Sequence, residues 1–137
     1  MALELMPVLN RVARAQLVRR GAISRTLVVQ GRELHLLDLP GQGEGPPLVV
    51  LHGLGSSALA FAGVLPGLAR FSRRVLAADL PGAGFSPLHG TPPDILESVE
   101  LLSALYAREL PETPAVADIG CLLRSENVGS KISIPPC

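Results

Sequence analysis

Short apolar runs that end abruptly in glycine-rich chain are the dominant pattern of this sequence. Residues 48–51 (Leu-Val-Val-Leu) lead into the His-Gly pair at 52–53, and residues 75–78 (Val-Leu-Ala-Ala) lead into Asp-Leu-Pro-Gly at 79–82. Continuous apolar runs of this length, bounded by turn residues, are typical of buried parallel strands. Two such units in succession predict an open α/β sheet.

The chain before the first of these strands predicts a helix and a hairpin. Apolar residues at near-helical spacing indicate a helix over residues 8–20, which Gly21 ends. Branched and apolar runs at 23–29 and 34–39 flank Gln-Gly at 30–31, a turn signal. We therefore expect two antiparallel strands ahead of the parallel ones.

Two further helices are expected to connect the strands. One should run from about residue 57 to residue 71, with Ser56 or Ser57 as its N-cap. The other should cover 94–110 with Asp94 as its cap. Its expected buried face is Ile95, Val99, Leu102 and Leu105 or Tyr106. Strands that alternate with helices predict right-handed crossovers in a parallel sheet.

The loop at residues 40–47 contains three alternating glycines, Gly41, Gly43 and Gly45. This spacing is superficially similar to a phosphate-binding loop. It lacks the Lys-Ser/Thr pair of a P-loop, and it precedes a strand instead of a helix. We therefore expect no nucleotide site there.

Composition favours one globular domain and argues against nucleic acid as a partner. The 137 residues are 47% apolar and 18% charged, with a formal net charge of +0. These values oppose disorder. A neutral chain whose arginines are scattered among acidic residues offers no electrostatic footprint for DNA or RNA.

The cysteines and the N-terminal segment bear on location. Cys121 and Cys137 match no zinc or redox spacing and are too few for a disulfide scaffold, so we expect a cytoplasmic protein. Residues 1–20 lack the features of a signal peptide, and no apolar run is long enough for a membrane span. Their arginines also fit a transit peptide, but an amphipathic helix lying across the domain is favoured.

Residues 31–116 resemble the N-terminal portion of an α/β-hydrolase-fold enzyme. The motifs that carry the resemblance are Leu-His-Gly-Leu-Gly-Ser-Ser at 51–57 and Asp-Leu-Pro-Gly-Ala-Gly-Phe-Ser at 79–86, which follow a predicted hairpin. The fold class that it implies is α/β: the N-terminal part of an α/β-hydrolase sheet, with a hairpin, then parallel strands with crossover helices, truncated before the nucleophile elbow.

The resemblance assigns an oxyanion-hole role to the loop after the predicted strand 48–51. In that family, this loop supplies one backbone N–H to the developing negative charge, and glycines allow the close approach. The matching donor here is the backbone N–H of Leu54, with Gly53 and Gly55 shaping the loop. The alternative is an ordinary glycine-rich turn between a strand and a helix.

Several polar residues near these motifs are expected to be structural. The family's catalytic histidine lies late in the chain, so His52 should support the loop, and Asp79 should accept backbone N–H groups in the turn that contains Gly82 and Gly84. Helix capping is the expected role of Ser56 and Ser57, and Ser86 should end the turn. His35 and His89 have no partner that the sequence identifies.

No nucleophile, acid or base of the family can be matched in this chain, so its status as an enzyme is left open. Gly-x-Ser-x-Gly is absent, and Cys121 follows Gly120 without the second glycine that a strained elbow needs. From about Asp118 the composition changes, which suggests truncation or a change of reading frame. The expected organisation is an amphipathic helix at 1–22, a partial α/β-hydrolase domain at 23–117 and an irregular tail at 118–137.

Three functional interpretations follow. The favoured one is an N-terminal fragment of a serine hydrolase, inactive by itself, whose intact relative hydrolyses an ester or other acyl-type bond of a small molecule. The alternatives are a small enzyme that uses Cys121 or an atypical serine, and a binding or regulatory module that docks through its exposed sheet edge. No cofactor or metal is implied. The unprotected edge also predicts marginal stability or self-association.

Overall fold

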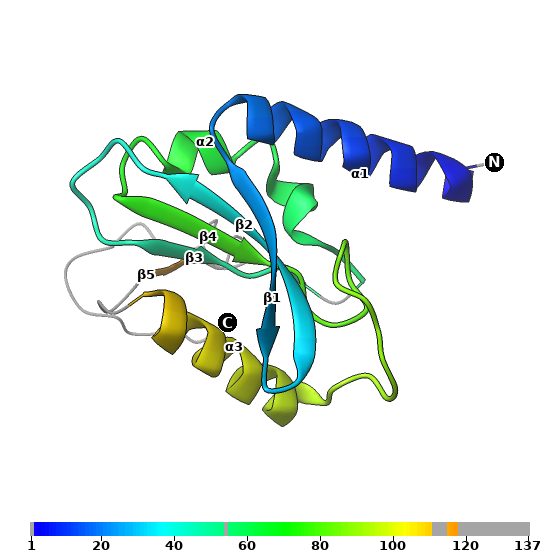
Figure 1. Ribbon diagram of the computed structural model, residues 1–137. Helices are drawn as coiled ribbons and strands as arrows, with labels where there is room; N and C mark the ends of the chain where they lie inside the picture. The colour runs from blue at the N-terminus through cyan, green and yellow to red at the C-terminus, as the bar shows by residue number, and fades with distance from the viewer. Residues whose placement is uncertain (1, 54, 111–114, 118–137) are drawn as a thin grey trace.

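A five-stranded sheet flanked by helices forms the body of the protein (Figure 1). The computed structural model describes residues 2–53, 55–110 and 115–117. In chain order, the elements are α1 (Ala2–Arg19), β1 (Ile23–Val29), β2 (Arg32–Pro40), β3 (Leu48–Val50), the 3₁₀-helix η1 (Ala58–Phe61), α2 (Leu65–Leu68), β4 (Arg74–Ala78), α3 (Ile95–Glu109) and β5 (Ala115–Ala117). Within these residues, no helix combines the length and apolar character needed to cross a bilayer.

The sheet has the strand order β1-β2-β4-β3-β5. β1 and β2 form an antiparallel hairpin, and β2 pairs antiparallel with β4. β3 lies between β4 and β5 and is parallel to both. The predicted hairpin and the parallel strands that follow it are therefore confirmed.

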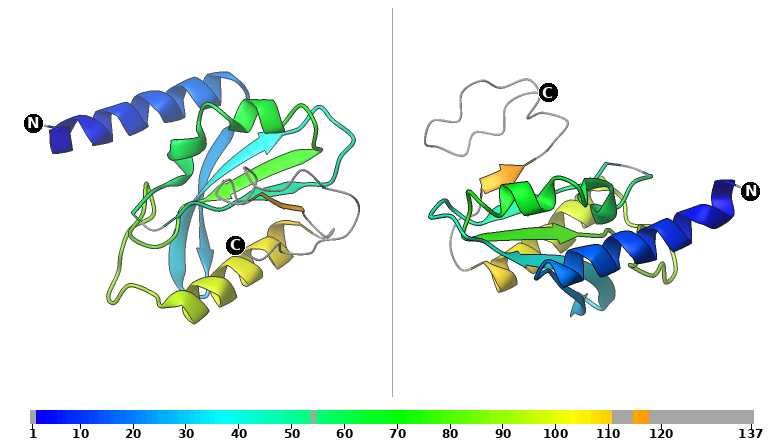
Figure 2. Two further views of the ribbon diagram at one scale, coloured as in Figure 1. Left: turned by 180° about the vertical axis from the view of Figure 1, so that it is seen from behind. Right: turned by 90° about the horizontal axis from the view of Figure 1, so that it is seen from above.

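Both faces of the sheet are buried, because side chains of alternate residues enter two separate cores. Val75 and Ala77 of β4 contact the core beneath α1, η1 and α2, while Leu76 and Ala78 contact the core beneath α3. Leu37 of β2 likewise belongs to the first core. This alternation explains the continuous apolar runs in the sequence, and Figure 2 shows the layers edge-on.

Two predicted turns are confirmed by their backbone conformation. Gln30 and Gly31 have φ angles of 49° and 76°, as a two-residue hairpin loop with type I′ geometry requires. At the end of α1, Gly21 has a φ of 96°, and the Ala22 N–H donates to the Leu17 carbonyl at 3.0 Å. This closing bond is typical of a Schellman motif.

The single helix predicted over 57–71 is wrong. The structure has two short pieces there, η1 and the four-residue α2. Gly63, Pro66 and Gly67 lie in this segment, and glycine and proline carry the largest intrinsic cost in a helix. The segment is therefore less helical than predicted.

Helix α3 begins as predicted, and the C-terminal part of its predicted face is buried, whereas the N-terminal part is exposed. Asp94 accepts the Glu97 backbone N–H at 2.8 Å, and the Glu97 carboxylate accepts the Asp94 N–H at 3.0 Å, which completes a capping box. The buried residues are Leu101 and Leu105, with Leu102 and Tyr106 packed beside them. Ile95 and Val99, expected on the buried face, are 77% and 55% exposed, because the first turns of α3 extend past the core.

The glycine-rich loop at 40–47 packs directly against backbone. The Gly41 N–H donates to the Arg73 carbonyl at 2.8 Å, and the Gly43 N–H donates to the Ser72 carbonyl at 3.1 Å. A Cβ atom built on Gly41 would lie 1.8 Å from the Ser72 carbonyl oxygen. The alternating glycines therefore serve a close approach between two chain segments.

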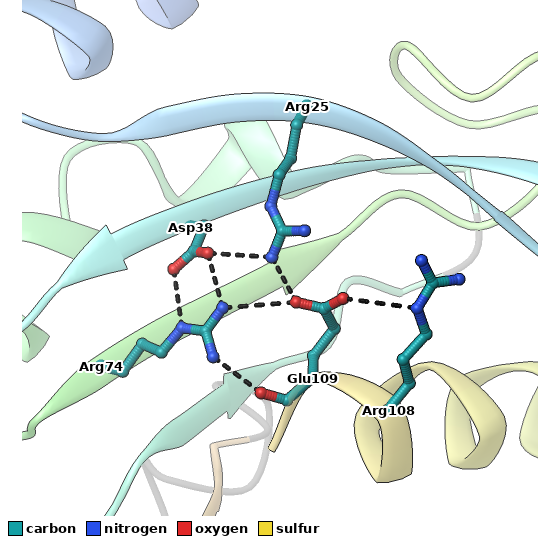
Figure 3. A network of polar contacts seen from close by, with 5 residues as sticks. All are labelled: Arg25, Asp38, Arg74, Arg108 and Glu109. Carbon is teal, nitrogen blue, oxygen red and sulfur yellow. Dashed lines mark hydrogen bonds and ion pairs between the residues drawn. The ribbon is translucent and has the colours of Figure 1, made fainter. Parts of the chain in front are cut away.

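A cluster of charges at the C-terminal end of α3 ties three strands to the helix (Figure 3). Arg74 of β4 donates two hydrogen bonds to Asp38 of β2, from Nε to Oδ1 at 2.9 Å and from Nη2 to Oδ2 at 2.7 Å. Arg25 of β1 bridges Asp38 and Glu109. Arg74 Nη1 also donates to the Glu109 carbonyl at 2.7 Å, which satisfies a helix-end acceptor.

The two carboxylates of this cluster have pKa values below their ordinary range. Burial by itself raises the pKa of Asp38, but hydrogen bonds and charge from Arg74, and then from Arg25, outweigh it. The hydrogen bond from Arg25 is the main cause that lowers the pKa of Glu109, against a smaller opposing effect of burial. Both groups therefore stabilise the folded state in their ionised form.

We predict that acid destabilises the protein through this cluster. Because the folded-state pKa values are depressed, the stabilisation is complete above the unfolded values of about 4 and is lost as pH falls through the folded values. Chemical denaturation between pH 7 and pH 2.5 should show the free energy of unfolding falling in this window. Asp38→Asn should lower it at pH 7 by about 1.5–3 kcal/mol and reduce the acid dependence. An unchanged pH dependence in that variant would contradict the assignment.

Candidate functional site

An open cleft of about 510 Å³ lies at the carboxyl ends of β3 and β4. Its floor and walls come from the loop that follows β3, described at 52–53 and 55–57, and from the turn at 80–84 that follows β4. Met6 and Asn10 of α1 line the same cleft. Ligands of open α/β sheets bind outside the carboxyl ends of the strands, so this cleft is the candidate site.

His52 ties the two loops that form the cleft. Its Nε2 accepts the Leu80 N–H at 3.1 Å, and its Nδ1 lies 2.9 Å from the Gly53 carbonyl oxygen. A carbonyl oxygen only accepts, so this pair of bonds assigns the proton to Nδ1 of a neutral imidazole. Both ring nitrogens are occupied, which supports the prediction of a structural role.

The glycine-rich loop after β3 has a tight backbone path. Gly55 has a φ of 72°, and the Ser56 N–H donates to the Gly53 carbonyl at 3.2 Å. Leu54, the predicted oxyanion donor, lies outside the described residues. Its role, and those of Gly53 and Gly55 in shaping a donor, therefore stay predictions.

The side chain of Asp79 accepts hydrogen bonds from three segments beside the cleft, and its exposed fraction is 0%. Oδ1 accepts the Ala58 N–H at 2.7 Å, at the start of η1. Oδ2 accepts the Phe85 N–H at 3.1 Å and a hydrogen bond from Nδ1 of His35 at 2.8 Å. One carboxylate therefore joins the segment after β3, the turn after β4 and strand β2.

The turn at 79–86 closes around this carboxylate. Ser86 Oγ donates to the Asp79 carbonyl at 2.6 Å and accepts the His35 N–H at 2.8 Å. The Gly82 N–H donates to the Ser86 carbonyl at 3.2 Å. Gly84 has a φ of 53°, and a Cβ atom built on it would lie 2.3 Å from Asp79 Oδ2. Any side chain at position 84 would therefore collide with the buried carboxylate of Asp79, which explains why the motif has a glycine there.

His35 belongs to this cluster, although no sequence motif pairs it with Asp79. His35 is 2% exposed, and its Nε2 lies 2.8 Å from Ser24 Oγ. A histidine inside the apolar run 34–39 signals a buried polar group that needs partners. Its partner Asp79 lies 44 positions away, so only the strand pairing reveals the contact.

The remaining candidates fall outside this cluster. Ser57 precedes η1 without a side-chain capping bond, which corrects the predicted cap, because the Ala60 N–H donates to the Ser57 carbonyl instead of to its side chain. His89 is exposed beside Glu33, with 3.4 Å between Nε2 and Oε2. Cys121 lies outside the described residues, and the described part of the chain holds no group of three metal-binding side chains.

We predict that Gly84→Ala destabilises the protein far more than Gly90→Ala. Both glycines have positive φ angles, but nothing lies within 4 Å of a Cβ atom built on Gly90. Gly90→Ala should cost only the conformational strain, about 1–2 kcal/mol. Gly84→Ala should also displace the Asp79 carboxylate and cost about 3 kcal/mol or more in the free energy of unfolding. Equal losses in the two variants would show that the carboxylate contact contributes nothing.

Comparison with known proteins agrees with this architecture. Residues 46–106 match the family model described as alpha/beta hydrolase fold. The chain is 45% identical over 71 residues to a pimeloyl-[acyl-carrier protein] methyl ester esterase of Aeromonas hydrophila. It is 51% identical over 47 residues to the magnesium-chelatase 30 kDa subunit of Rhodobacter capsulatus. The structure of Cfl2 from Burkholderia cenocepacia superposes with a TM-score of 0.62 at 30% identity.

These matches cover 34–69% of this chain but at most 32% of each matched protein. The esterase match spans 51% of this chain but 26% of the esterase, and the magnesium-chelatase subunit match spans 34% and 16%. The Cfl2 match covers 69% of this chain and 32% of that structure. Hydrolysis is an activity of the family, and the described sheet is a partial version of its fold. The chain is similar to the N-terminal portion of proteins of the α/β-hydrolase family.

Proposed function

We propose that this chain supplies the oxyanion side of a hydrolase site that acts on an ester or other acyl-type bond of a small molecule. The observation that carries the proposal is the cleft at the carboxyl ends of β3 and β4, whose two loops are joined by the bond from Leu80 to His52. Hydrolysis by acyl transfer requires fixed donors where negative charge develops. In this proposal the Leu54 N–H is such a donor.

The surrounding residues are proposed to hold that donor in place. Gly53 and Gly55 permit the close turn, and the positive φ of Gly55 supports this role. Asp79 fixes the end of the loop through the Ala58 N–H. His52, Gly82 and Gly84 shape the facing turn. A donor gains most when its surroundings need not reorganise during the reaction, so rigid support of this kind favours oxyanion stabilisation.

Catalysis by the chain alone is not part of this proposal. In the family resemblance, the nucleophile, acid and base belong to segments that follow the described sheet, and a donor without them leaves little activity. The esterase relative is named for a pimeloyl-[acyl-carrier protein] methyl ester, and the magnesium-chelatase subunit is named for another process. The substrate of this chain is therefore proposed only as an ester or acyl compound. A cytoplasmic location is proposed from the two sparse cysteines.

A sharp test replaces the matching segment of the Aeromonas esterase by residues 46–106 of this chain. The chimera should hydrolyse the esterase's substrate. Leu54→Pro removes the donor N–H and should lower kcat by about 10²–10³-fold, whereas Leu54→Ala keeps the N–H and should change it only a few-fold. Thermal unfolding of both variants controls for misfolding. Equal activity of the two variants would refute the oxyanion role.

The chain by itself should show no multiple turnover of p-nitrophenyl acetate. With a hundredfold excess of ester, the steady rate should not saturate and should not exceed that of free imidazole at the concentration of the three histidines. Cys121→Ala and Ser57→Ala should leave this rate unchanged. A saturable steady rate that either substitution abolishes would show a working small enzyme instead.

A binding or regulatory module is the second candidate. β5 is the last strand in the sheet order, and Ile95 and Leu96 of α3 are 77% and 74% exposed. Sheet edges and uncovered apolar helix faces are surfaces onto which partner chains dock. This candidate requires a stoichiometric complex, including self-association, and the first candidate does not.

A further inference from the structure

We infer that Ser24 is a reactive serine, separate from the cleft, with His35 as its base and Asp79 as the group that orients the base. Ser24 Oγ lies 2.8 Å from His35 Nε2, and His35 Nδ1 lies 2.8 Å from Asp79 Oδ2. Hydroxyl, imidazole and carboxylate thus bond in the series that activates a serine, and such arrangements are recognised by geometry and not by sequence position. The ligand class is an electrophilic acyl or phosphonyl ester.

The strand pairing of the hairpin creates this series. Thr26 of β1 lies opposite His35 of β2, and Ser24 lies opposite Leu37. Side chains two residues apart on a strand share a face, so Ser24 is the diagonal neighbour of His35. The pairing of β1 with β2, and of β2 with β4, thereby places Ser24, His35 and Asp79 in a row.

The imidazole of His35 is fixed in the orientation that a base needs. Its Nδ1 donates to the fully buried Asp79 carboxylate, which leaves Nε2 as the acceptor that faces Ser24. The ring also packs edge-on against Phe85, with 5.1 Å between ring centroids. A second function for Asp79 is consistent with its contacts, since the N–H groups of Ala58 and Phe85 keep the carboxylate in place.

Exposure increases along the series toward the hydroxyl. Asp79 and His35 are 0% and 2% exposed, while Ser24 is partly exposed on β1, at the end of the sheet order. A buried base and an accessible hydroxyl are what a nucleophile requires. Ser24 does not line the cleft, so reagents reach it from the edge of the sheet.

The reaction proposed is a single transfer to Ser24. With an alkyl fluorophosphonate, Ser24 Oγ forms a bond to phosphorus and fluoride leaves. The hydroxyl proton passes to His35 Nε2, and Asp79 stabilises the imidazolium. One equivalent is consumed per chain, so this reactivity is distinct from the steady turnover that tests the proposed function.

Labelling with an alkyl fluorophosphonate, followed by peptide mass spectrometry, tests the inference. The folded chain should gain one adduct, on Ser24, and Ser24→Ala should abolish it. His35→Gln should slow labelling by about 10²-fold, the usual contribution of a general base. Thr26→Ala, which removes a neighbouring hydroxyl on the same strand, should label at the rate of the unsubstituted chain. Ser57→Ala should do so as well.

Two results would overturn the inference. One is an adduct on another serine, such as Ser57 in the cleft; the other is labelling of Ser24 no faster than in the denatured chain. Because His35→Gln alters a buried partner of Asp79, a second pair of variants keeps His35 intact. Ser24→Cys should react with iodoacetamide faster than Thr26→Cys, since Ser24 Oγ is the group that lies within hydrogen-bond distance of His35 Nε2. Equal rates would mean that the contact between Ser24 and His35 is only a structural bond.

Discussion

The buried carboxylate of Asp79 is the interaction on which the rest of this structure depends. It lies at the end of β4 and accepts hydrogen bonds from η1, from the following turn and from β2. An ionised group without such partners would be too costly to bury, so the three segments must converge for the carboxylate to remain inside. The same bonds set the walls of the cleft and align His35 with Ser24.

A second group of charged side chains joins neighbouring segments at the opposite end of β4. Asp38 and Glu109 hold Arg25 and Arg74 across β1, β2, β4 and α3, while apolar contacts fill both faces of the sheet between the two clusters. The core contains few aromatic side chains, because aromatics are only 3% of the sequence. The hydrogen-bonded polar clusters at the two ends of β4 therefore fix the orientation of neighbouring segments, which aliphatic packing does not do by itself.

The sequence predicted the strands, the hairpin turn and the α3 cap, because each depends on local periodicity or on one turn residue. It failed where the outcome depends on distant contacts. The Ser57 side chain does not cap η1, whose first N–H donates to the distant Asp79, and the exposed Ile95 and Val99 reflect where the core ends. The pairing of His35 with Asp79 could not be foreseen, because it depends on the antiparallel pairing of β2 with β4. The cleft motifs were recognisable, whereas the role of Leu54 remains a prediction.

Amide hydrogen exchange in Asp79→Asn would test the central role of this carboxylate most directly. The asparagine has one acceptor oxygen, and its NH₂ group would face an N–H donor in either orientation. We predict that the Ala58 amide or the Phe85 amide, whichever faces the NH₂ group, loses protection, while amides at the centre of β4 keep theirs. Unchanged protection at both positions would show that the loops hold their places without the carboxylate, and would contradict the account.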